Sequence, residues 1–594
     1  MWNQRFRSAA PPQETRLVKS TLSTLALIWR LASPYFRSDD KWMGRLLLGA
    51  VIAIELSLVA INVLLNAWNN RFYTALQNRN WNSFVYELGY FCVLAVVFIV
   101  LAVYQLYLNQ WLQIRWRRFL TERYLSAWID NGTHYRMQLV GEAADNPDQR
   151  IADDLQRFVE QTLSIGIGLL SSVVTLGSFV VILWGLSDDA PLTIAGHVVP
   201  IPGYLVWAAL FYAVAGTWIT HLIGRPLIAL NFDQQRYEAD FRFNLVRVRE
   251  NAEQIALLGG EAAERRRLLE RFAAVMGNWY AIMTQQKRLT SFTSGYGQVS
   301  SVFPFIVISP AYFAGAIQLG ELMQTASAFG SVQSALSFFV TAYRSIAEWR
   351  SVLARLDGFE TSVAAGRAAG GLPPMREAAD APALGIRDLD LRLPDGRPLG
   401  ATADLAIKPR ERVLVGGPSG AGKSTLFRAI AGIWPFGTGR IAVPRGARLM
   451  VLPQRPYLPI GPLHAAVTYP APPEAFDRDA VREAVGAVGL PALADRLDED
   501  AHWNRMLSPG EQQRLGIARA LLHAPDYLLL DEATASLDEP AEATLYKLLI
   551  ERLPGAAIVS ISHRSTLAAF HPRRLEFTPE HGRFRVREAA PAQS

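Results

Sequence analysis

The sequence predicts a multi-domain protein in which an all-α part with six membrane-spanning helices is followed by a soluble α/β part. Hydrophobic residues make up 50% of the 594 residues, and a chain of this length is expected to form two or more domains. Several apolar runs reach the ~20 residues that a helix needs to cross a bilayer. Beyond residue 383 the composition changes to that of a soluble α/β domain.

Six segments are apolar and long enough to be membrane spans. Their expected bounds are Met43–Leu65, Leu88–Leu108, Leu163–Leu186, Tyr204–Ile223, Tyr296–Ile317 and Met323–Ile346. The last is rich in Ser, Gln and Thr, and by itself it also fits a buried soluble helix. An even number of spans returns the chain to its starting side, which favours six.

Basic residues are divided unevenly between the loops. The long loops 109–162 and 224–295 are rich in Arg, whereas loops 66–87, 187–203 and 318–322 contain only Arg71 and Arg79. Positive loops stay in the cytoplasm, so both termini are expected there. The net charge of +6 is then explained by topology, and no nucleic-acid partner is expected. Membrane lipid is an expected partner.

The expected domain order follows from these segments. Residues 1–40 form a cytoplasmic N-terminal segment, with an amphipathic helix over Leu17–Phe36 at the membrane surface. Residues 41–360 form the six-span domain, and its two long cytoplasmic loops are expected to continue the spans as helices. Residues 361–383, rich in Ala, Gly and Pro, are expected to be a flexible linker, and residues 384–594 form the α/β domain.

A phosphate-binding loop follows a short apolar strand, Arg412–Val415, and precedes a helix over Thr425–Ala431. It matches the P-loop pattern, in which glycines let backbone N–H groups converge on phosphate oxygens at a helix N-terminus. Lys423 is expected on the β- and γ-phosphates and Ser424 on Mg²⁺. The expected nucleotide contacts are Gly417, Pro418, Ser419, Gly420, Ala421, Gly422, Lys423, Ser424 and Thr425.

Two acidic residues end a second predicted strand, Tyr527–Leu530. In a P-loop protein, Asp531 is expected to hold Mg²⁺ through water, and Glu532 to act as general base on the attacking water. Such a pair can also be an ordinary strand end, but the P-loop in the same chain favours the catalytic interpretation.

Further motifs resemble those of ABC ATPases. Leu507-Ser508-Pro509-Gly510-Glu511 resembles the ABC signature, Gln454 the Q-loop glutamine, His563 the switch histidine and Asp538 the D-loop residue. The resemblance implies that ATP and Mg²⁺ are the cofactors and that Gln454 senses the γ-phosphate beside the metal. It also implies that Ser508, Gly510 and Glu511 contact nucleotide held by a second subunit, with Asp538 at the dimer interface.

Two departures from the ABC pattern have expected consequences. Pro509 lacks an N–H group, which removes one backbone donor to the γ-phosphate and is expected to slow hydrolysis. No aromatic residue occurs between Phe359 and Phe427, so the ring that usually stacks on adenine is missing near Leu393–Gly396. An apolar side chain would replace it, with relaxed base selectivity.

The membrane part narrows the resemblance. Asn146-Pro147-Asp148-Gln149-Arg150-Ile151 and the segment from Glu238 to Glu261 resemble two groups with an exporter-type ABC fold. These are the peroxisomal acyl-CoA half-transporters and the bacterial BacA-related half-transporters with a fused ATPase, and the variant signature favours the second group. Since the chain has one P-loop and one signature, two chains are expected to pair, as a homodimer by preference and a heterodimer as the alternative. The resemblance implies a bacterial inner membrane, with Asp148 and Arg150 at a site that couples ATPase and spans.

Polar residues inside the spans are candidates for the transport pathway. Gln324, Ser327, Ser331 and Ser334 recur at helical spacing in the sixth segment, and Glu55 lies in the middle of the first. A water-filled cavity is the preferred interpretation of the stripe, and close helix packing is the alternative. Glu55 is either a functional group or the partner of a neighbouring polar side chain.

By this resemblance, the expected function is ATP-driven import of a bulky hydrophilic solute, such as an antimicrobial peptide or a cobalamin-like molecule. One alternative is export or flipping of a lipid or acyl conjugate. A second, from another class, is a membrane-tethered regulatory ATPase that transports nothing. A soluble ABC ATPase acting on DNA or ribosomes is disfavoured by the spans.

Overall fold

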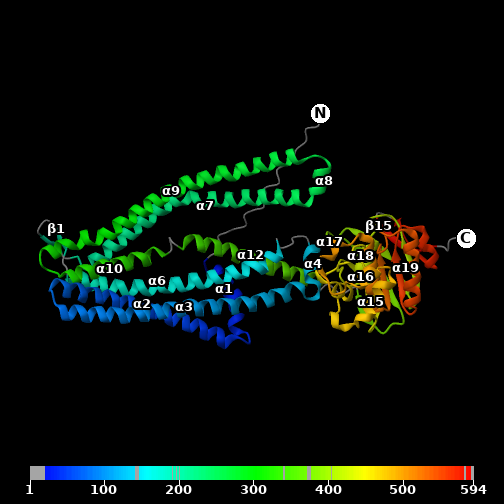
Figure 1. Ribbon diagram of the computed structural model, residues 1–594, viewed down its shortest axis with the longest axis horizontal. Coiled ribbons are helices and arrows are strands. Elements are labelled where there is room, and N and C mark those ends of the chain that lie inside the picture. The colour runs from blue at the N-terminus through cyan, green and yellow to red at the C-terminus, as the bar shows by residue number, and fades with distance from the viewer. Residues whose placement is uncertain are drawn as a thin grey trace. The chain divides into compact units, whose positions relative to one another are not determined.

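The computed structural model describes residues 21–140, 146–189, 192–194, 197–199, 201–338, 342–370, 376–402, 404–580 and 583–589. These residues form two compact units (Figure 1). Unit 1 comprises Met1–Arg123 and Asp148–Asp357, and unit 2 comprises Tyr124–Pro147 and Gly358–Ser594. Three of the described helices, α3, α5 and α12, contribute residues to both units.

Long helices build unit 1. They are α1 (Thr21–Ala32), α2 (Lys41–Gln77), α3 (Trp81–Ile129), α6 (Leu155–Asp189), α7 (Tyr204–Glu250), α9 (Glu261–Phe313), α10 (Leu319–Leu336) and α12 (Tyr343–Gly370). Shorter elements are η1 (Tyr35–Arg37), α5 (Pro147–Gln149), η3 (Arg150–Asp154), α8 (Ala252–Leu257) and the hairpin β1 (Leu192–Ile194) with β2 (His197–Val199). The expected helical extensions of the spans are confirmed, since α3, α7 and α9 run for 49, 47 and 53 residues.

Four helices in the described residues are long and apolar enough to cross a membrane, namely α2, the helical stretch from Trp81 to Val140, that from Pro147 to Asp188, and α7. They contain the first four predicted spans. The fifth predicted span falls mostly on the end of α9 and the sixth on α10 and the start of α12, with residues 339–341 outside the described part. Length and composition alone do not identify these two segments as membrane spans, because they are more polar than the first four.

The packing of α10 gives a physical reason for its polarity. Phe329 and Thr325 are fully buried, and Phe329 packs in one cluster with Phe179 and Ile308. On α3, by contrast, the side chains of Val96, Ile99 and Val103 are 61%, 59% and 60% exposed. Large apolar side chains left exposed along a helix suit a lipid environment, whereas α10 is shielded by its neighbours and tolerates polar residues.

A mixed sheet of eleven strands forms the centre of unit 2. Its order is β3-β8-β4-β5-β15-β14-β7-β13-β12-β9, with β6 beside β4. The strands are β3 (Arg376–Ala379), β4 (Leu384–Arg392), β5 (Pro398–Thr402), β6 (Leu405–Ile407), β7 (Arg412–Gly416), β8 (Gly437–Pro444), β9 (Leu449–Leu452), β12 (Tyr527–Asp531), β13 (Ala557–Ile561), β14 (Arg573–Glu580) and β15 (Arg583–Glu588). The run β9-β12-β13-β7-β14 is parallel.

Helices of unit 2 connect and cover these strands. They are α4 (Thr133–Val140), α13 (Lys423–Ile430), α14 (Leu463–Thr468), α15 (Arg478–Ala487), α16 (Pro491–Ala494), α17 (Trp503–Met506), α18 (Pro509–His523) and α19 (Glu539–Arg552), with short turns η2 (Asp130–Gly132), η4 (Pro473–Ala475) and η5 (Ser565–Phe570). A short ladder pairs β10 (Gly461–Pro462) with β11 (Asp500–Ala501). Because the carboxyl ends of β7, β12 and β13 meet at one edge, loops from distant parts of the sequence converge there.

The segment 361–383, expected to be a flexible linker, contains regular structure over much of its length. Residues 361–370 continue α12, and residues 376–379 form β3. The Ala-rich sequence has high helix propensity, and tertiary contacts support it. Val363 is buried, and a Cβ on Gly366 would lie 2.9 Å from Cγ of Met137. The predicted N-terminal helix is observed as α1, and residues 17–20 lie outside the described part.

Candidate nucleotide site and membrane pathway

The P-loop connects β7 to α13 in a conformation that only glycine tolerates at two positions. Gly417 and Gly422 have φ of 131° and 93°. A Cβ on Gly417 would lie 2.7 Å from Cβ of Phe577, and one on Gly422 would lie 2.9 Å from Cγ of Leu399. The strand-loop-helix context expected for this motif is therefore present, with the first turn of α13 at the end of the loop.

Lys423 is buried at the start of α13, and its ammonium group donates hydrogen bonds to the carbonyl oxygens of Gly417 and Pro418, each at 2.8 Å. Burial lowers the pKa of Lys423, and the carboxylates of Glu532 and Asp531 oppose this shift. A partly desolvated cation at a helix N-terminus favours a polyanionic ligand.

Asp531 lies at the end of β12 opposite the P-loop. Its Oδ1 accepts a hydrogen bond of 2.9 Å from the hydroxyl of Ser424. Burial raises the pKa of Asp531, and the Ser424 hydrogen bond opposes this shift. A hydroxyl beside one carboxylate fits Mg²⁺, which takes few protein oxygens and completes its shell with phosphates and water. The described parts of the chain contain no group of three or more His, Cys, Asp or Glu residues arranged to hold a metal ion.

The three residues expected to be catalytic come together around Glu532. Gln454 donates from Nε2 to Glu532 Oε2 at 3.1 Å, and His563 Nε2 lies 3.4 Å from Glu532 Oε1. Glu532 has a φ of 50°, in the left-handed region that non-glycine residues rarely adopt. Strained backbone of this kind occurs where a side chain must be aimed, and here it turns the carboxylate of Glu532 toward Gln454 and His563.

The signature segment begins α18 with a capping box. The Ser508 hydroxyl accepts from the Glu511 N–H, and the Glu511 carboxylate accepts from Ser508 N–H at 2.8 Å and from its hydroxyl at 2.7 Å. These hydrogen bonds lower the pKa of Glu511. Pro509 occupies the first helical position, where its missing N–H costs the helix nothing. Glu511 is thus engaged as a helix cap. Asp538 likewise caps α19, accepting from Ala541 N–H at 3.0 Å.

Two residues that sequence reasoning missed connect these motifs. Gln513 is 3% exposed; it donates to the Gln454 carbonyl at 2.9 Å and accepts from Ser536 N–H at 2.9 Å. Arg564 donates to the carbonyls of Leu537 and Ala535 at 2.7 and 3.1 Å.

The contacts therefore close a ring around the catalytic residues. It runs from Glu532 to Gln454, on to Gln513 and residues 535–537, and returns through Arg564 and its neighbour His563. The position of Gln513 could have been predicted from helical spacing, because Gln513 lies four residues before Ile517 and so shares the buried face of α18. No local pattern pointed to Arg564.

Comparisons with known proteins agree with this geometry. Residues 31–313 match the family described as ABC transporter transmembrane region 2, and residues 401–535 match the ABC transporter family. An inner membrane ABC transporter ATP-binding protein of Escherichia coli, YddA, is 33% identical over 90% of this chain and 94% of its own length. The chain belongs to the ABC transporter family.

Relatives place this ABC transporter near the D family of half-transporters. ABC transporter D family member 2, chloroplastic, of Arabidopsis thaliana is 32% identical over 97% of this chain and 90% of its own. The lysosomal cobalamin transporter ABCD4 of the mouse is 26% identical, covering 95% of each chain. A solved bacterial Atm1-family ABC exporter with ATP bound has a TM-score of 0.68 at 18% identity, over 91% of this chain and 94% of its own. The transporter therefore has the expected fold, with fused membrane and ATPase parts, and couples ATP hydrolysis to transport.

In the membrane unit of the transporter, two of the predicted pathway residues, Glu55 and Gln324, are hydrogen-bonded to neighbouring helices. Glu55 on α2 accepts a hydrogen bond from Gln105 on α3. Gln324 on α10 accepts from Asn70 Nδ2 at 2.8 Å, and its carbonyl accepts from Asn66. The Ser331 hydroxyl donates to the carbonyl of Ser327, while Ser334 is exposed. Glu55 therefore has a polar partner on the neighbouring helix, and its role in transport stays a prediction.

Asp148 and Arg150, both expected at the coupling site, differ in exposure, and their coupling role stays a prediction. Arg150 is 6% exposed, and its guanidinium donates to Asp154 Oδ2 at 2.6 Å within the π-helical turn η3. Arg355 of α12 donates to both oxygens of the same carboxylate, at 2.8 and 2.6 Å. Arg150 therefore belongs to a buried ionic cluster in unit 1, because Asp154 lies one helical turn after it. Asp148 is exposed on α5.

Proposed function

We propose that two copies of this transporter form a homodimer in a bacterial inner membrane and import a bulky hydrophilic solute or peptide. The convergence of Lys423, the Ser424–Asp531 pair and Glu532 at the ends of parallel strands supports the ATPase part of this proposal. Gln454 and His563, which flank the Glu532 carboxylate, complete the catalytic set.

Each residue has a proposed role that follows from its position. Lys423 neutralises phosphate charge, and Glu532 accepts the proton of the attacking water. Gln454 and His563 orient the Glu532 carboxylate and contact the γ-phosphate. Ser424, Asp531 and Gln454 hold Mg²⁺, which neutralises charge on the phosphates when bound. Ser508, Gly510, Glu511 and Asp538 face the nucleotide of the second copy.

Two features support a dimer. The chain contains a P-loop and a signature that in ABC proteins serve different nucleotides, so two chains complete two sites. In addition, the hairpin of α7 and α9, joined at α8, exposes large apolar side chains on its cytoplasmic extension. Phe232, Phe243, Leu257 and Leu258 are 67%, 63%, 79% and 85% exposed. An apolar surface on an extramembrane arm indicates a protein partner, and a second copy gives a self-complementary interface.

The proposed location and cargo rest on relatives. YddA is an inner membrane protein, and ABCD4 is a lysosomal cobalamin transporter. The resemblance to BacA-related transporters and the polar residues of α10 support a bulky hydrophilic cargo, such as a cationic peptide or cobalamin. The Arg-rich loops support cytoplasmic termini.

Transport in inside-out vesicles tests the proposal. ATP added outside reaches the ATPase domains, so import predicts that cobalamin or a cationic peptide loaded into the lumen is lost to the outside. Glu532→Gln is expected to abolish this loss, with hydrolysis lowered by roughly 10²-fold or more. Glu551→Gln, an exposed residue of α19, is the matched control.

The other outcomes are equally distinct. Accumulation in the lumen of inside-out vesicles would indicate export and overturn the proposed direction. Hydrolysis without movement of any tested lipid or solute would favour a regulatory ATPase. Hydrolysis that survives Lys423→Ala, or a protein that stays monomeric with MgATP, would contradict the proposed site and dimer.

A further inference from the structure

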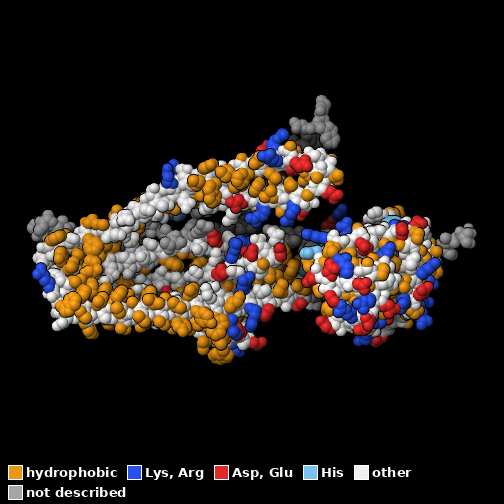
Figure 2. Space-filling model, in the orientation of Figure 1, with side chains coloured by type: hydrophobic (Ala, Val, Ile, Leu, Met, Phe, Trp, Pro, Cys, Tyr) orange, Lys and Arg blue, Asp and Glu red, His pale blue; other side chains and the backbone are white. Residues whose placement is uncertain are grey.

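One carboxylate of unit 2 is enclosed by protein. Figure 2 shows Asp and Glu side chains scattered over the face of this unit that is in view, whereas Glu542 of α19 is 1% exposed. Among the described residues of unit 2, Glu542 is the only buried Asp or Glu. Burial of a charge is costly unless partners satisfy it, so the contacts of this carboxylate show what it holds in place.

Both oxygens of the Glu542 carboxylate have a partner. Oε1 accepts a hydrogen bond of 2.6 Å from the hydroxyl of Thr534, which is itself 3% exposed. Oε2 accepts from Nη1 of Arg564 at 3.3 Å. The two partners come from different loops, so the carboxylate bridges the loop after β12 and the loop after β13.

These two partners adjoin the residues that are expected to be catalytic. Thr534 lies two positions after Glu532, and Arg564 directly follows His563. The pairing of β12 with β13 reaches only the residue before Glu532, and the Glu532 N–H then donates to the carbonyl of Ile561 at 3.2 Å. The backbone ladder therefore ends where the reactive side chains begin.

Side chains connect the two loops beyond the end of the ladder. Besides its contact with Glu542, Arg564 donates to the carbonyls of Ala535 and Leu537 at 3.1 and 2.7 Å. A guanidinium presents its donors in one rigid plane, so these acceptors together fix its orientation. Because Arg564 follows His563 directly, the orientation of its side chain also restrains the backbone that carries His563.

We infer that Glu542 is a positioning residue for ATP hydrolysis, which holds the His563 imidazole beside the Glu532 carboxylate. Its charge orients the Arg564 guanidinium, and its hydrogen bond with Thr534 fixes the start of the loop after Glu532. The distance of 3.4 Å between His563 Nε2 and Glu532 Oε1 depends on both contacts. The role of Glu542 rests on the proposed catalytic roles of Glu532 and His563.

Steady-state ATPase kinetics of the full-length protein test this role. Glu542→Gln keeps the shape of the side chain but removes the charge that faces Arg564. We expect kcat to fall about tenfold while KM for ATP stays nearly constant, because the contact orients catalytic groups and does not bind nucleotide.

A double-variant cycle measures whether Glu542 acts through Arg564. Arg564→Gln is also expected to lower kcat about tenfold, and the double variant should match it within about twofold, because both changes break one connection. Losses that multiply to roughly a hundredfold would show independent effects and contradict the role. Thr534→Val, which has the same shape and lacks the hydroxyl, gives the same cycle with Glu542→Gln if Arg564→Gln does not fold.

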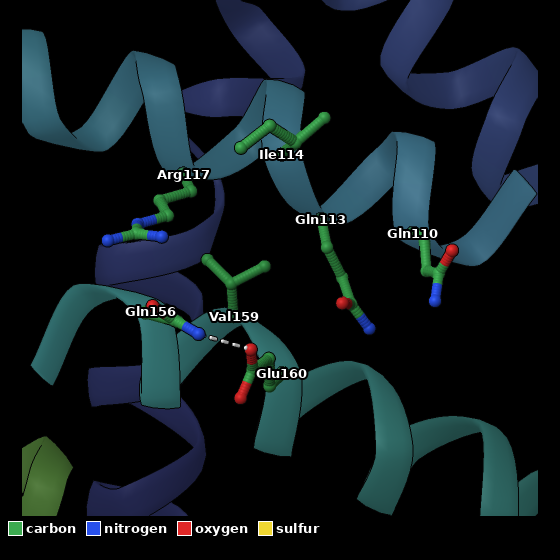
Figure 3. A pocket seen from close by; sticks show the side chains of 7 residues that line it. All are labelled: Gln110, Gln113, Ile114, Arg117, Gln156, Val159 and Glu160. Carbon is green, nitrogen blue, oxygen red and sulfur yellow. Dashed lines mark hydrogen bonds between the residues drawn. The ribbon is translucent and has the colours of Figure 1, made fainter. Parts of the chain in front are cut away.

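Two controls separate positioning from stability and from charge. Leu549 is fully buried two helical turns farther along the same face of α19, so Leu549→Ala leaves a cavity. It should lower the unfolding midpoint at least as much as Glu542→Gln, with kcat near the original. Glu160→Gln makes the same change of charge at an exposed residue of unit 1, where Gln156 donates to Glu160 in a polar pocket of about 170 Å³ between α3 and α6 (Figure 3). It should change neither quantity.

An unchanged kcat in Glu542→Gln would overturn the positioning role, as would an equal loss of kcat in Leu549→Ala. Both results leave the proposed catalytic site intact as long as Glu532→Gln abolishes hydrolysis. Hydrolysis that survives Glu532→Gln counts against the proposed function itself, whatever the effect of changing Glu542.

Discussion

The two units of this transporter hold their polar groups in different ways. In unit 2, reactive side chains stand at the ends of strands, where loops bring Gln454 and His563 to one carboxylate. In unit 1, polar side chains pair from helix to helix, as Glu55 does with Gln105 and Asp154 with Arg355. A polar group between helices needs a partner for the fold itself. A polar side chain at a strand end of unit 2 therefore indicates chemistry. A polar side chain between the helices of unit 1 indicates helix packing before it indicates a function.

The largest expected effect on stability comes from the buried carboxylate of Asp154. Asp154→Ala removes the anion that Arg150 and Arg355 share, and breaking a buried ion pair costs about 3 kcal/mol. We expect the unfolding midpoint of the purified protein to fall by several degrees, with the affinity for ATP unchanged. The exposed neighbour variant Asp153→Ala should unfold like the original. Equal midpoints for both variants would refute a stabilising role for the cluster.

A smaller effect, chiefly on the rate of ATP hydrolysis, is expected at Gln513. Gln513→Ala breaks the connection between the Gln454 carbonyl and Ser536 N–H. The loss of these buried hydrogen bonds is expected to lower kcat about tenfold while KM for ATP stays nearly constant. Steady-state ATPase kinetics measure both constants.

A neighbouring glutamine provides the control for Gln513. The Gln512 side chain donates to the carbonyls of Asn504 in α17 and of Leu507, both just before α18. Gln512→Ala should therefore lower the unfolding midpoint as much as Gln513→Ala does, and leave kcat closer to the original. If both variants lose the same kcat, Gln513 is a structural residue and not a positioning residue for the Glu532 site.

The smallest effect is expected at Glu55. Glu55→Gln keeps a polar group that can bond Gln105, so uptake of cargo should stay within about twofold of the original. ATP-dependent flux in proteoliposomes measures this. Loss of uptake with unchanged ATP hydrolysis would instead show that Glu55 acts in transport, and would remove the contrast between the two units at this position.

The local motifs were predictable because their geometry is set over few residues. The P-loop, the strand ending at Asp531 and the capping box at Ser508 each depend on neighbours in the sequence. Hydropathy predicted the first four spans, because a bilayer demands long apolar helices. The polar fifth and sixth segments were harder, since α10 is shielded by other helices and composition alone does not reveal that shielding.

By itself, the sequence determined the family, the ATP-binding chemistry and the residues that meet at Glu532, because motif order and spacing specify them. Only the tertiary structure decided which distant groups pair. Asp154 meets Arg355 across 201 positions, Gln513 joins two loops, and Arg150 is buried beside Asp154. Such pairs depend on how helices and strands pack in space, and a polar side chain carries the same identity in the sequence whether its partner is water, phosphate or a neighbouring helix.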